Sequence, residues 1–98
     1  MNPLIMASFY YVYVLYSLTD QQLYTGYTKD LKSRIDQHKN GRVKSTKNRR
    51  PLKLIYFEGS RNQKDATHRE KYLKTSHGKM FLGNRLKNWR KHDKPNLI

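Results

Sequence analysis

The stretch FYYVYVLY, residues 9–16, decides the fold of this chain. Its aromatic and β-branched side chains favour an extended strand, and a run of this length without charges is typical of a strand buried on both faces. A polar segment with turn-forming residues follows, and residues 23–27 (LYTGY) return as a second short strand. The two strands are therefore predicted to pair as an antiparallel hairpin.

A helix is predicted directly after this hairpin, at residues 31–39. Thr28 or Asp30 can serve as its N-cap, and the Asn-Gly pair at residues 40–41 supplies a stop. Three side chains spaced at i, i+4 and i+7 form the face that should meet the sheet, namely Leu31, Ile35 and His38.

The second half of the chain adds one strand and two predicted helices. In LKLIYFE, residues 52–58, strict alternation would place Leu52, Leu54 and Tyr56 on one face. Helices are predicted over residues 62–75 and from about 78 to 91. The order β-β-α-β-α-α predicts an α/β (α+β) fold, a three-stranded mainly antiparallel sheet flanked by helices. Residues 1–98 should form one domain, with its core at about residues 9–91.

Composition restricts the function classes. The chain has 21 Lys and Arg against 7 Asp and Glu, a formal net charge of +14, which predicts salt-sensitive binding to a nucleic acid. It has no cysteine, which excludes disulfides, thiolate metal sites and a cysteine nucleophile. No apolar run reaches the roughly 20 residues of a membrane helix, and the start lacks signal-peptide features. No membrane association and a cytoplasmic location are expected.

The segment KNGRVKSTKNRR, residues 39–50, is the best candidate for contact with phosphates. It holds six basic residues and no acid, a composition predicted to form a solvated loop. A second basic stretch lies in the last predicted helix, at residues 85–91. The candidate nucleic-acid-binding residues of the first segment are Arg42, Lys44, Lys47, Arg49 and Arg50.

Glu70 is unusual because it shares a helical face with Ala66 and Leu73, the face predicted to meet the sheet. A carboxylate there needs an Arg, a Lys or a bound metal, since an unpaired buried charge is costly. An ordinary ion pair at the edge of the stripe is the alternative. Glu58, at the end of the third strand, is the rival metal ligand.

Arg34 and the tyrosines could complete a site with Glu70. Arg34 flanks the apolar face of the first predicted helix, and a guanidinium there can bind a phosphate with two hydrogen bonds. Tyrosines concentrate in the first two strands, where the hydroxyls of Tyr11, Tyr13, Tyr24 and Tyr27 could bind a water or a phosphate. The alternatives are a surface charge and simple sheet packing.

The order of these residues resembles the GIY-YIG endonuclease family over residues 9–86. Tyr11-Val12-Tyr13 stands where the family has Gly-Ile-Tyr, and Tyr24-Thr25-Gly26 where it has Tyr-Ile-Gly. Arg34 and His38 follow in LKSRIDQH, and Glu70 lies in DATHREKYLK. The chain is most similar to small stand-alone members, which are related to the N-terminal nuclease domain of the excinuclease C subunit.

The resemblance implies a DNA endonuclease with one divalent cation, Mg²⁺ or Mn²⁺, held by Glu70. In that scheme Tyr13 orients or deprotonates the attacking water, Tyr24 supports it, Arg34 stabilises developing charge and His38 assists proton transfer. DNA repair or recombination is the expected setting. A small domain without specificity modules should need a protein partner or the shape of the DNA to select its substrate.

Two departures from the family pattern leave an alternative open. Tyr11 replaces the first glycine of the motif, and the family's asparagine has only a positional counterpart, Asn84. The alternative is a non-catalytic nucleic-acid-binding module with the same fold. Zinc is not expected, because the remaining histidines, at positions 68, 77 and 92, lack metal-binding spacing.

Overall fold

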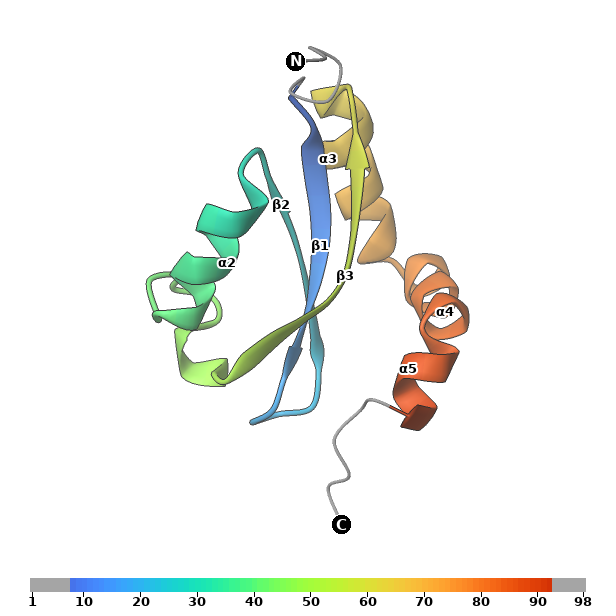
Figure 1. The fold of residues 1–98 in the computed structure, drawn as a ribbon. Coiled ribbons are helices and arrows are strands. Elements are labelled where there is room, and N and C mark those ends of the chain that lie inside the picture. The colour runs from blue at the N-terminus through green and yellow to red at the C-terminus, as the bar shows by residue number, and fades with distance from the viewer. Residues whose placement is uncertain (1–7, 93–98) are drawn as a thin grey trace.

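The computed structural model describes residues 8–92 and confirms the predicted α+β class (Figure 1). A three-stranded sheet lies between one helix on one side and three helices on the other. The elements, in chain order, are β1 Tyr10–Ser17, β2 Leu23–Thr28, α2 Leu31–Lys39, the short 3₁₀ helix η1 Lys47–Arg49, β3 Leu52–Ser60, α3 Gln63–Leu73, α4 Ser76–Arg85 and α5 Lys87–His92.

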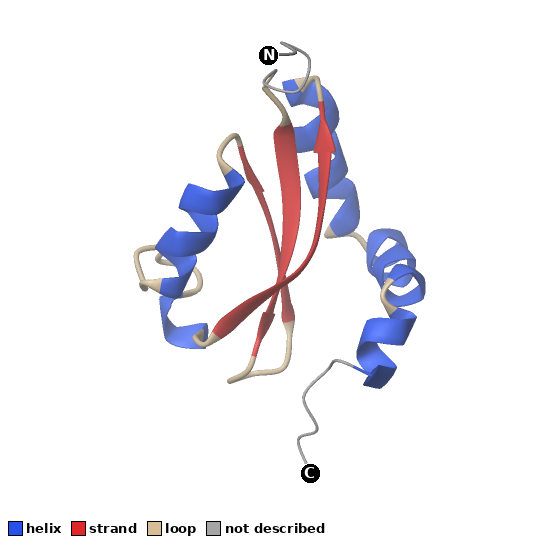
Figure 2. Cartoon of the chain, in the orientation of Figure 1, coloured by secondary structure: helices blue, strands red, loops and turns tan. Residues whose placement is uncertain are grey.

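The first strand is the centre of the sheet, whose order is β2-β1-β3 with both pairings antiparallel (Figure 2). Tyr13 pairs with Gly26 on β2 and with Phe57 on β3. Every residue from Val12 to Ser17 is buried, as predicted for this strand. Since a central strand has neighbours on both edges and helices over both faces, its continuous apolar run is explained.

Two separate cores lie on the two faces of the sheet. The core beneath α2 contains Tyr13, Leu15, Ile35 and Leu52. The larger core beneath the C-terminal helices contains Val12, Val14, Ala66, Leu73, Leu82 and Leu86. Odd and even positions of β1 therefore divide between the two cores up to Leu15, the alternation that a pleated strand imposes.

The predicted alternation of β3 is wrong from Ile55 onward. Val14 pairs with Tyr56 and Leu15 with Leu54, so Ile55 is an extra residue in β3, a β-bulge. The bulge reverses which side chains of β3 point to which face of the sheet. Leu54 packs beneath α2, whereas Ile55 and Tyr56 both pack against the other core. Tyr56 therefore does not share a face with Leu54.

The predicted first two helices are confirmed, with Asp30 and Asn62 as their N-caps. The third predicted helix is wrong in its limits, because it begins at Ser76 and is broken at Leu86. The backbone of Leu86 (φ −108°, ψ 18°) ends α4, and the turn lets Trp89 pack against Tyr16, with ring centroids 5.2 Å apart. No helix in the described part of the chain is long and apolar enough to span a membrane.

The basic segment at residues 39–50 is not the fully solvated loop that its composition predicts. Val43 and Thr46 are buried, with 6% and 0% of their surface exposed, and η1 follows them. Arg49 pairs with Asp20 in the turn between β1 and β2, at 2.6 Å from Nε to Oδ2. The buried Val43 and Thr46 side chains and the ion pair of Arg49 with Asp20 together anchor the segment that carries these cations.

Candidate functional site

On the side of the sheet that α2 covers, the structure brings together four of the predicted site residues: Tyr13, Tyr24, Arg34 and His38. Tyr13 lies on β1 and Tyr24 on β2, with ring centroids 6.4 Å apart. The His38 ring, from the last turn of α2, lies 5.5 Å from the ring of Tyr13 and 5.3 Å from that of Tyr24. Both contacts are edge-to-face, an arrangement favoured by the charge distribution of aromatic rings.

Gly26 makes room for Tyr13. A Cβ atom at this glycine would overlap the ring and the hydroxyl of Tyr13, so the phenol leans across the backbone of β2. Because β2 is an edge strand, this carries the hydroxyl of Tyr13 toward the edge of the sheet. The Tyr24-Thr25-Gly26 motif therefore needs a glycine at position 26, because a larger side chain would collide with Tyr13.

His38 is fully buried and bonded at both ring nitrogens. Its Nε2 lies 2.7 Å from the hydroxyl of Tyr13, and its Nδ1 lies 2.7 Å from Oγ1 of Thr46. Burial, and secondly the nearby Arg34 guanidinium, lower the pKa of His38 from 6.5 to about 4. The imidazole is therefore neutral at neutral pH, with one ring nitrogen donating a hydrogen bond to a hydroxyl and the other accepting one.

Thr46 was not predicted as a site residue. It belongs to the basic segment, where no periodic pattern distinguishes it, and only its position against His38 shows its role. The neighbouring Ser45 donates a weaker hydrogen bond, 3.4 Å long, to the hydroxyl of Tyr24. The basic segment is therefore hydrogen-bonded directly to His38 and Tyr24.

The pKa of Tyr13 is raised above its ordinary value of 10.0, chiefly by burial. Arg34 lowers this pKa, while Tyr24 and Glu70 raise it, so all three lie within electrostatic reach of the Tyr13 hydroxyl. Arg34 is held by a hydrogen bond from its Nη1 to Oε1 of Gln37, 2.9 Å long. At neutral pH the Tyr13 hydroxyl is protonated.

Glu70 approaches this cluster from α3, on the other side of the sheet. Ala66 and Leu73 are buried, as the predicted stripe requires, but the Glu70 side chain keeps 22% of its surface exposed. Its Oε2 pairs with Nζ of Lys74 at 2.9 Å. The carboxylate is thus at the margin of the stripe, in the ion pair that the sequence left open as an alternative.

A groove of about 390 Å³ runs between β2 and the C-terminal helices, beside this ion pair. Tyr24 and Thr25 line it from the strand, and three cations line it from the C-cap of α3, from α4 and from α5: Lys74, Lys79 and Arg90. A concave surface with three cations and a hydroxyl is suited to bind phosphate.

Glu70 offers one carboxylate to a metal ion, the type of ligand that Mg²⁺ prefers. Within residues 8–92 no group of three or more His, Asp or Glu side chains is placed to hold a metal ion. Mg²⁺ accepts one or two carboxylates together with water and substrate phosphate, and the only partner of Glu70 among the described residues is a half-exposed lysine. A cation could therefore displace Lys74 and share Glu70 with a phosphate.

The rival ligand, Glu58, is engaged elsewhere. Its two oxygens accept hydrogen bonds from Nε and Nη2 of Arg69, 2.9 and 3.0 Å long, and Oε2 also accepts one from Tyr56. Glu58 pairs with Val12 and so lies on the face opposite Tyr13. Asn84 is exposed on α4, two residues beyond the buried Leu82 and hence on the opposite side of the helix.

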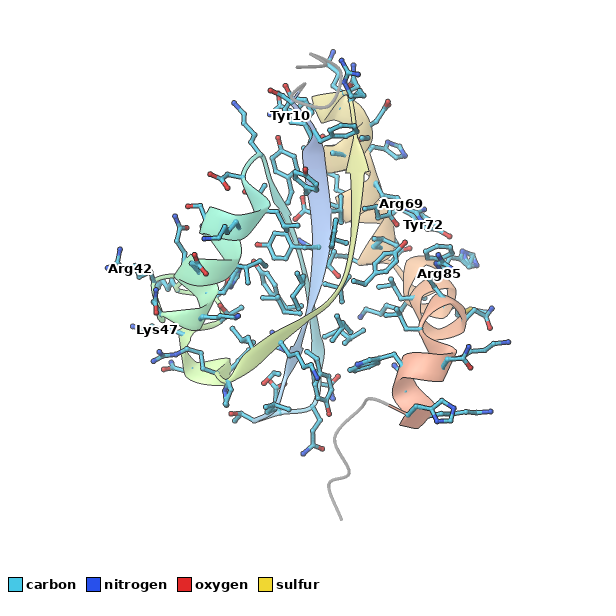
Figure 3. All side chains as sticks on the ribbon, viewed as in Figure 1. Tyr10, Arg42, Lys47, Arg69, Tyr72 and Arg85 are labelled. Carbon is cyan, nitrogen blue, oxygen red and sulfur yellow. The ribbon has the colours of Figure 1, made fainter. Side chains whose placement is uncertain are left out.

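The side chains predicted to contact phosphate differ in whether other residues already hold them. Arg42, Lys44 and Lys47 are exposed, and Figure 3 shows Arg42 and Lys47 projecting outward on the α2 side. Arg49 is held by Asp20, and Nε of Arg50 donates to the carbonyl of Lys47. The first three are therefore the side chains most available to a ligand.

The burial of His38 predicts a loss of stability in mild acid. The unfolded chain protonates this histidine near pH 6.5 and the folded protein only near pH 4, so the unfolded state binds more protons in between. We expect the free energy of unfolding to be constant above pH 6.5 on this account and to fall by about 3 kcal/mol down to pH 4. Urea unfolding at several pH values measures this change in the free energy of unfolding. His38→Gln should remove this slope, and an unchanged slope would contradict the assignment.

Comparison with known proteins agrees with this geometry. The GIY-YIG catalytic domain matches residues 9–88. A UPF0213 protein of Clostridium perfringens is 48% identical over 65 residues, which are 65% of this chain and 69% of the relative. A UPF0213 protein of Staphylococcus saprophyticus is 43% identical over 67 residues, which are 67% of this chain and 80% of that protein. The solution NMR structure of a UPF0213 protein from Bacillus halodurans superposes with a TM-score of 0.50 at 32% identity, covering 78% of this chain and 83% of that one.

The match runs through both tyrosine elements, the arginine helix and the glutamate helix, which are the elements that the structure brings to one edge of the sheet. This chain belongs to the GIY-YIG catalytic domain family.

Proposed function

We propose that the protein is a metal-dependent endonuclease that hydrolyses phosphodiester bonds in DNA. One observation carries the proposal: Tyr13 hydrogen-bonds to His38 and lies within electrostatic reach of Tyr24, Arg34 and Glu70. Family membership supports nuclease chemistry, and the net charge of +14 supports a polyanionic substrate.

Glu70 is the residue that would hold the divalent cation, Mg²⁺ or Mn²⁺. Such a cation, when bound, supplies charge that polarises the phosphate and neutralises the leaving oxygen. Glu70 offers one carboxylate, so tight binding of the cation should require the substrate phosphate as well. Lys74 would be released from Glu70 and become free to contact the phosphate.

Tyr13 and His38 would handle the attacking water. The oxygen of the protonated Tyr13 hydroxyl can accept a hydrogen bond from a water while its proton is directed at Nε2 of His38. The hydrogen bond at Nδ1 to Thr46 fixes the imidazole in the orientation that this transfer needs. Arg34 lowers the pKa of Tyr13 through a hydrogen bond and its positive charge, which would stabilise a deprotonated Tyr13 hydroxyl.

The cations around the site would bind and stabilise the phosphate. Arg34 lies beside the Tyr13 hydroxyl, where a guanidinium can stabilise charge that develops on phosphoryl oxygens. The groove cations, Lys74, Lys79 and Arg90, would hold the neighbouring backbone of the substrate.

The first experiment compares cleavage of supercoiled, linear and branched DNA with Mg²⁺, with Mn²⁺ and with EDTA. We expect cleavage with either metal and none with EDTA. Binding without cleavage on all three substrates would instead favour the alternative, a nucleic-acid-binding module without catalysis. The exposed cations of the basic segment would serve either function.

The basic segment should control the salt dependence of DNA binding. Replacing Arg42, Lys44 and Lys47 together by alanine should reduce the slope of log affinity against log salt by about 2 to 3, because each contact releases about one counterion. Fluorescence anisotropy with a duplex over a salt series measures this slope. Arg49 is left intact because its ion pair with Asp20 anchors the segment.

The matched control replaces three other exposed lysines, Lys64, Lys71 and Lys87, by alanine. It removes the same charge from the helices on the opposite side of the sheet. An equal reduction of the slope in this control would mean that the basic segment is not the contact surface.

A further inference from the structure

Three aromatic side chains form a cluster on the sheet beside α2, at the end where β1 begins and β3 ends. Tyr11 lies between Phe9 and Phe57, with ring centroids 6.4 and 6.0 Å apart. We call Phe9, Tyr11 and Phe57 the aromatic platform. Tyr11 precedes Tyr13 by one full pleat and Phe57 pairs with Tyr13, so the platform continues the face that carries the site.

The platform lies outside the core that α2 covers. That core includes Tyr13, Leu15 and Leu54 but not the platform residues, and 51% of Phe57 is exposed. In Figure 1 the beginning of β1 and the end of β3 extend past α2. Phe57 therefore offers apolar surface that a ligand can cover.

Gly59 lets the rings of Phe9 and Tyr11 lie close to the backbone of β3. It pairs with Tyr11, and a Cβ atom there would lie 3.4 Å from both the Phe9 and the Tyr11 rings. Because β3 carries no side chain at this point, the two rings lie close against its backbone. The three rings are inclined to one another, at 39° between Phe9 and Tyr11 and 66° between Tyr11 and Phe57.

Cations surround this surface. A hollow of about 730 Å³ begins at Tyr11 and is flanked by Lys29, Lys32 and Lys39, with Asp30 and Asp36 also on its rim. The guanidinium carbon of Arg61 lies 5.7 Å from the centre of the Phe9 ring. Aromatic faces bordered by mobile cations are the combination that binds single-stranded nucleic acid, since bases stack on the rings and cations follow the backbone.

We propose that the aromatic platform stacks the unpaired bases of single-stranded nucleic acid next to the phosphate at Tyr13. The inference rests on the nucleic-acid contact of the proposed function but does not require hydrolysis. Paired bases are stacked on one another and cannot use the platform, so a duplex would bind through its backbone alone. Substrates with a single-stranded segment beside the cleaved bond would then be preferred.

Binding of an oligo-dT of about 12 nucleotides and of a duplex of equal length, measured by fluorescence anisotropy in EDTA, tests this proposal. We expect Phe57→Leu to weaken oligo-dT binding roughly tenfold and to leave duplex binding and the salt slope unchanged, because leucine keeps the apolar surface but has no π face. Phe57→Tyr should bind oligo-dT with the same affinity as the unchanged protein, because tyrosine keeps the π face. Met80→Ala, which alters an exposed apolar residue on α4, is the control.

Equal affinity of Phe57→Leu and Phe57→Tyr for oligo-dT would overturn the proposal, whether or not the protein cleaves DNA. Sedimentation of the free protein at the same concentrations gives a second test. A dimer that dissociates on Phe57→Leu would assign this surface to a second copy of the chain and would also overturn it. Loss of metal-dependent cleavage with intact stacking would instead contradict only the proposed hydrolysis.

Discussion

Replacing Glu70 by glutamine or alanine is expected to reduce DNA cleavage by about a thousandfold, while DNA binding changes less than about twofold. Loss of the carboxylate removes the group that would hold the cation, whose charge is worth several kcal/mol in the transition state. One carboxylate in a chain with a net charge of +14 contributes little to binding. Stability should fall by less than about 1 kcal/mol, because the ion pair with the half-exposed Lys74 is near the surface.

Glu58→Gln is the matched control for this prediction. It removes the other carboxylate that the sequence offered as a metal ligand, but Glu58 is bonded to Arg69 and Tyr56 on the opposite face. We expect this variant to lose stability and to cleave at the rate of the unchanged protein well below its melting temperature. Cleavage lost in Glu58→Gln and kept in Glu70→Gln would exchange the two roles.

The sequence predicts the elements of this fold well because its signals are local. The run at residues 9–16 has no polar interruption, and Asp30 and Asn62 act through amides within three residues of themselves. The candidate site residues rest on a resemblance to a family, and the fold explains the spacing of its two tyrosine elements. Tyr13 and Tyr24 lie on adjacent strands of a hairpin, so eleven residues bring their rings to 6.4 Å.

The features that sequence reasoning missed depend on contacts between distant segments. The bulge at Ile55 exists only in the pairing of β3 with β1, so alternation within β3 gives no sign of it. The break at Leu86 depends on the packing of Trp89 against Tyr16 in the first strand. Thr46 joins the candidate site only through its hydrogen bond to His38 of α2, and neither composition nor period marks that threonine.

The position of Glu70 shows the limit of helical periodicity. Its spacing from Ala66 and Leu73 predicts the face correctly, and both neighbours are buried. Periodicity cannot tell how far a long side chain extends beyond the helix. The Glu70 carboxylate reaches the margin of the face and pairs with Lys74, close enough to Tyr13 to raise the pKa of its hydroxyl.

Replacing Tyr13 by phenylalanine should reduce cleavage by about a hundredfold to a thousandfold. The ring would still fill the core beneath α2, so the shape of the site is kept and only the hydroxyl is lost. That loss removes the oxygen that would orient the water and leaves Nε2 of the buried His38 without its partner at 2.7 Å. We expect a decrease in stability of about 1 to 3 kcal/mol, measured by urea unfolding.

Tyr27→Phe is the matched control, since it makes the same change in a neighbouring strand. The hydroxyl of Tyr27 is buried without a hydrogen-bond partner within residues 8–92, so its removal should leave stability unchanged or slightly higher and cleavage unaffected. Tyr13→Phe is then compared at equal folded fraction, with DNA binding measured in EDTA. If Tyr13→Phe cleaved as fast as Tyr27→Phe, the hydroxyl of Tyr13 would have no part in the chemistry, and its bond to His38 would serve the fold alone.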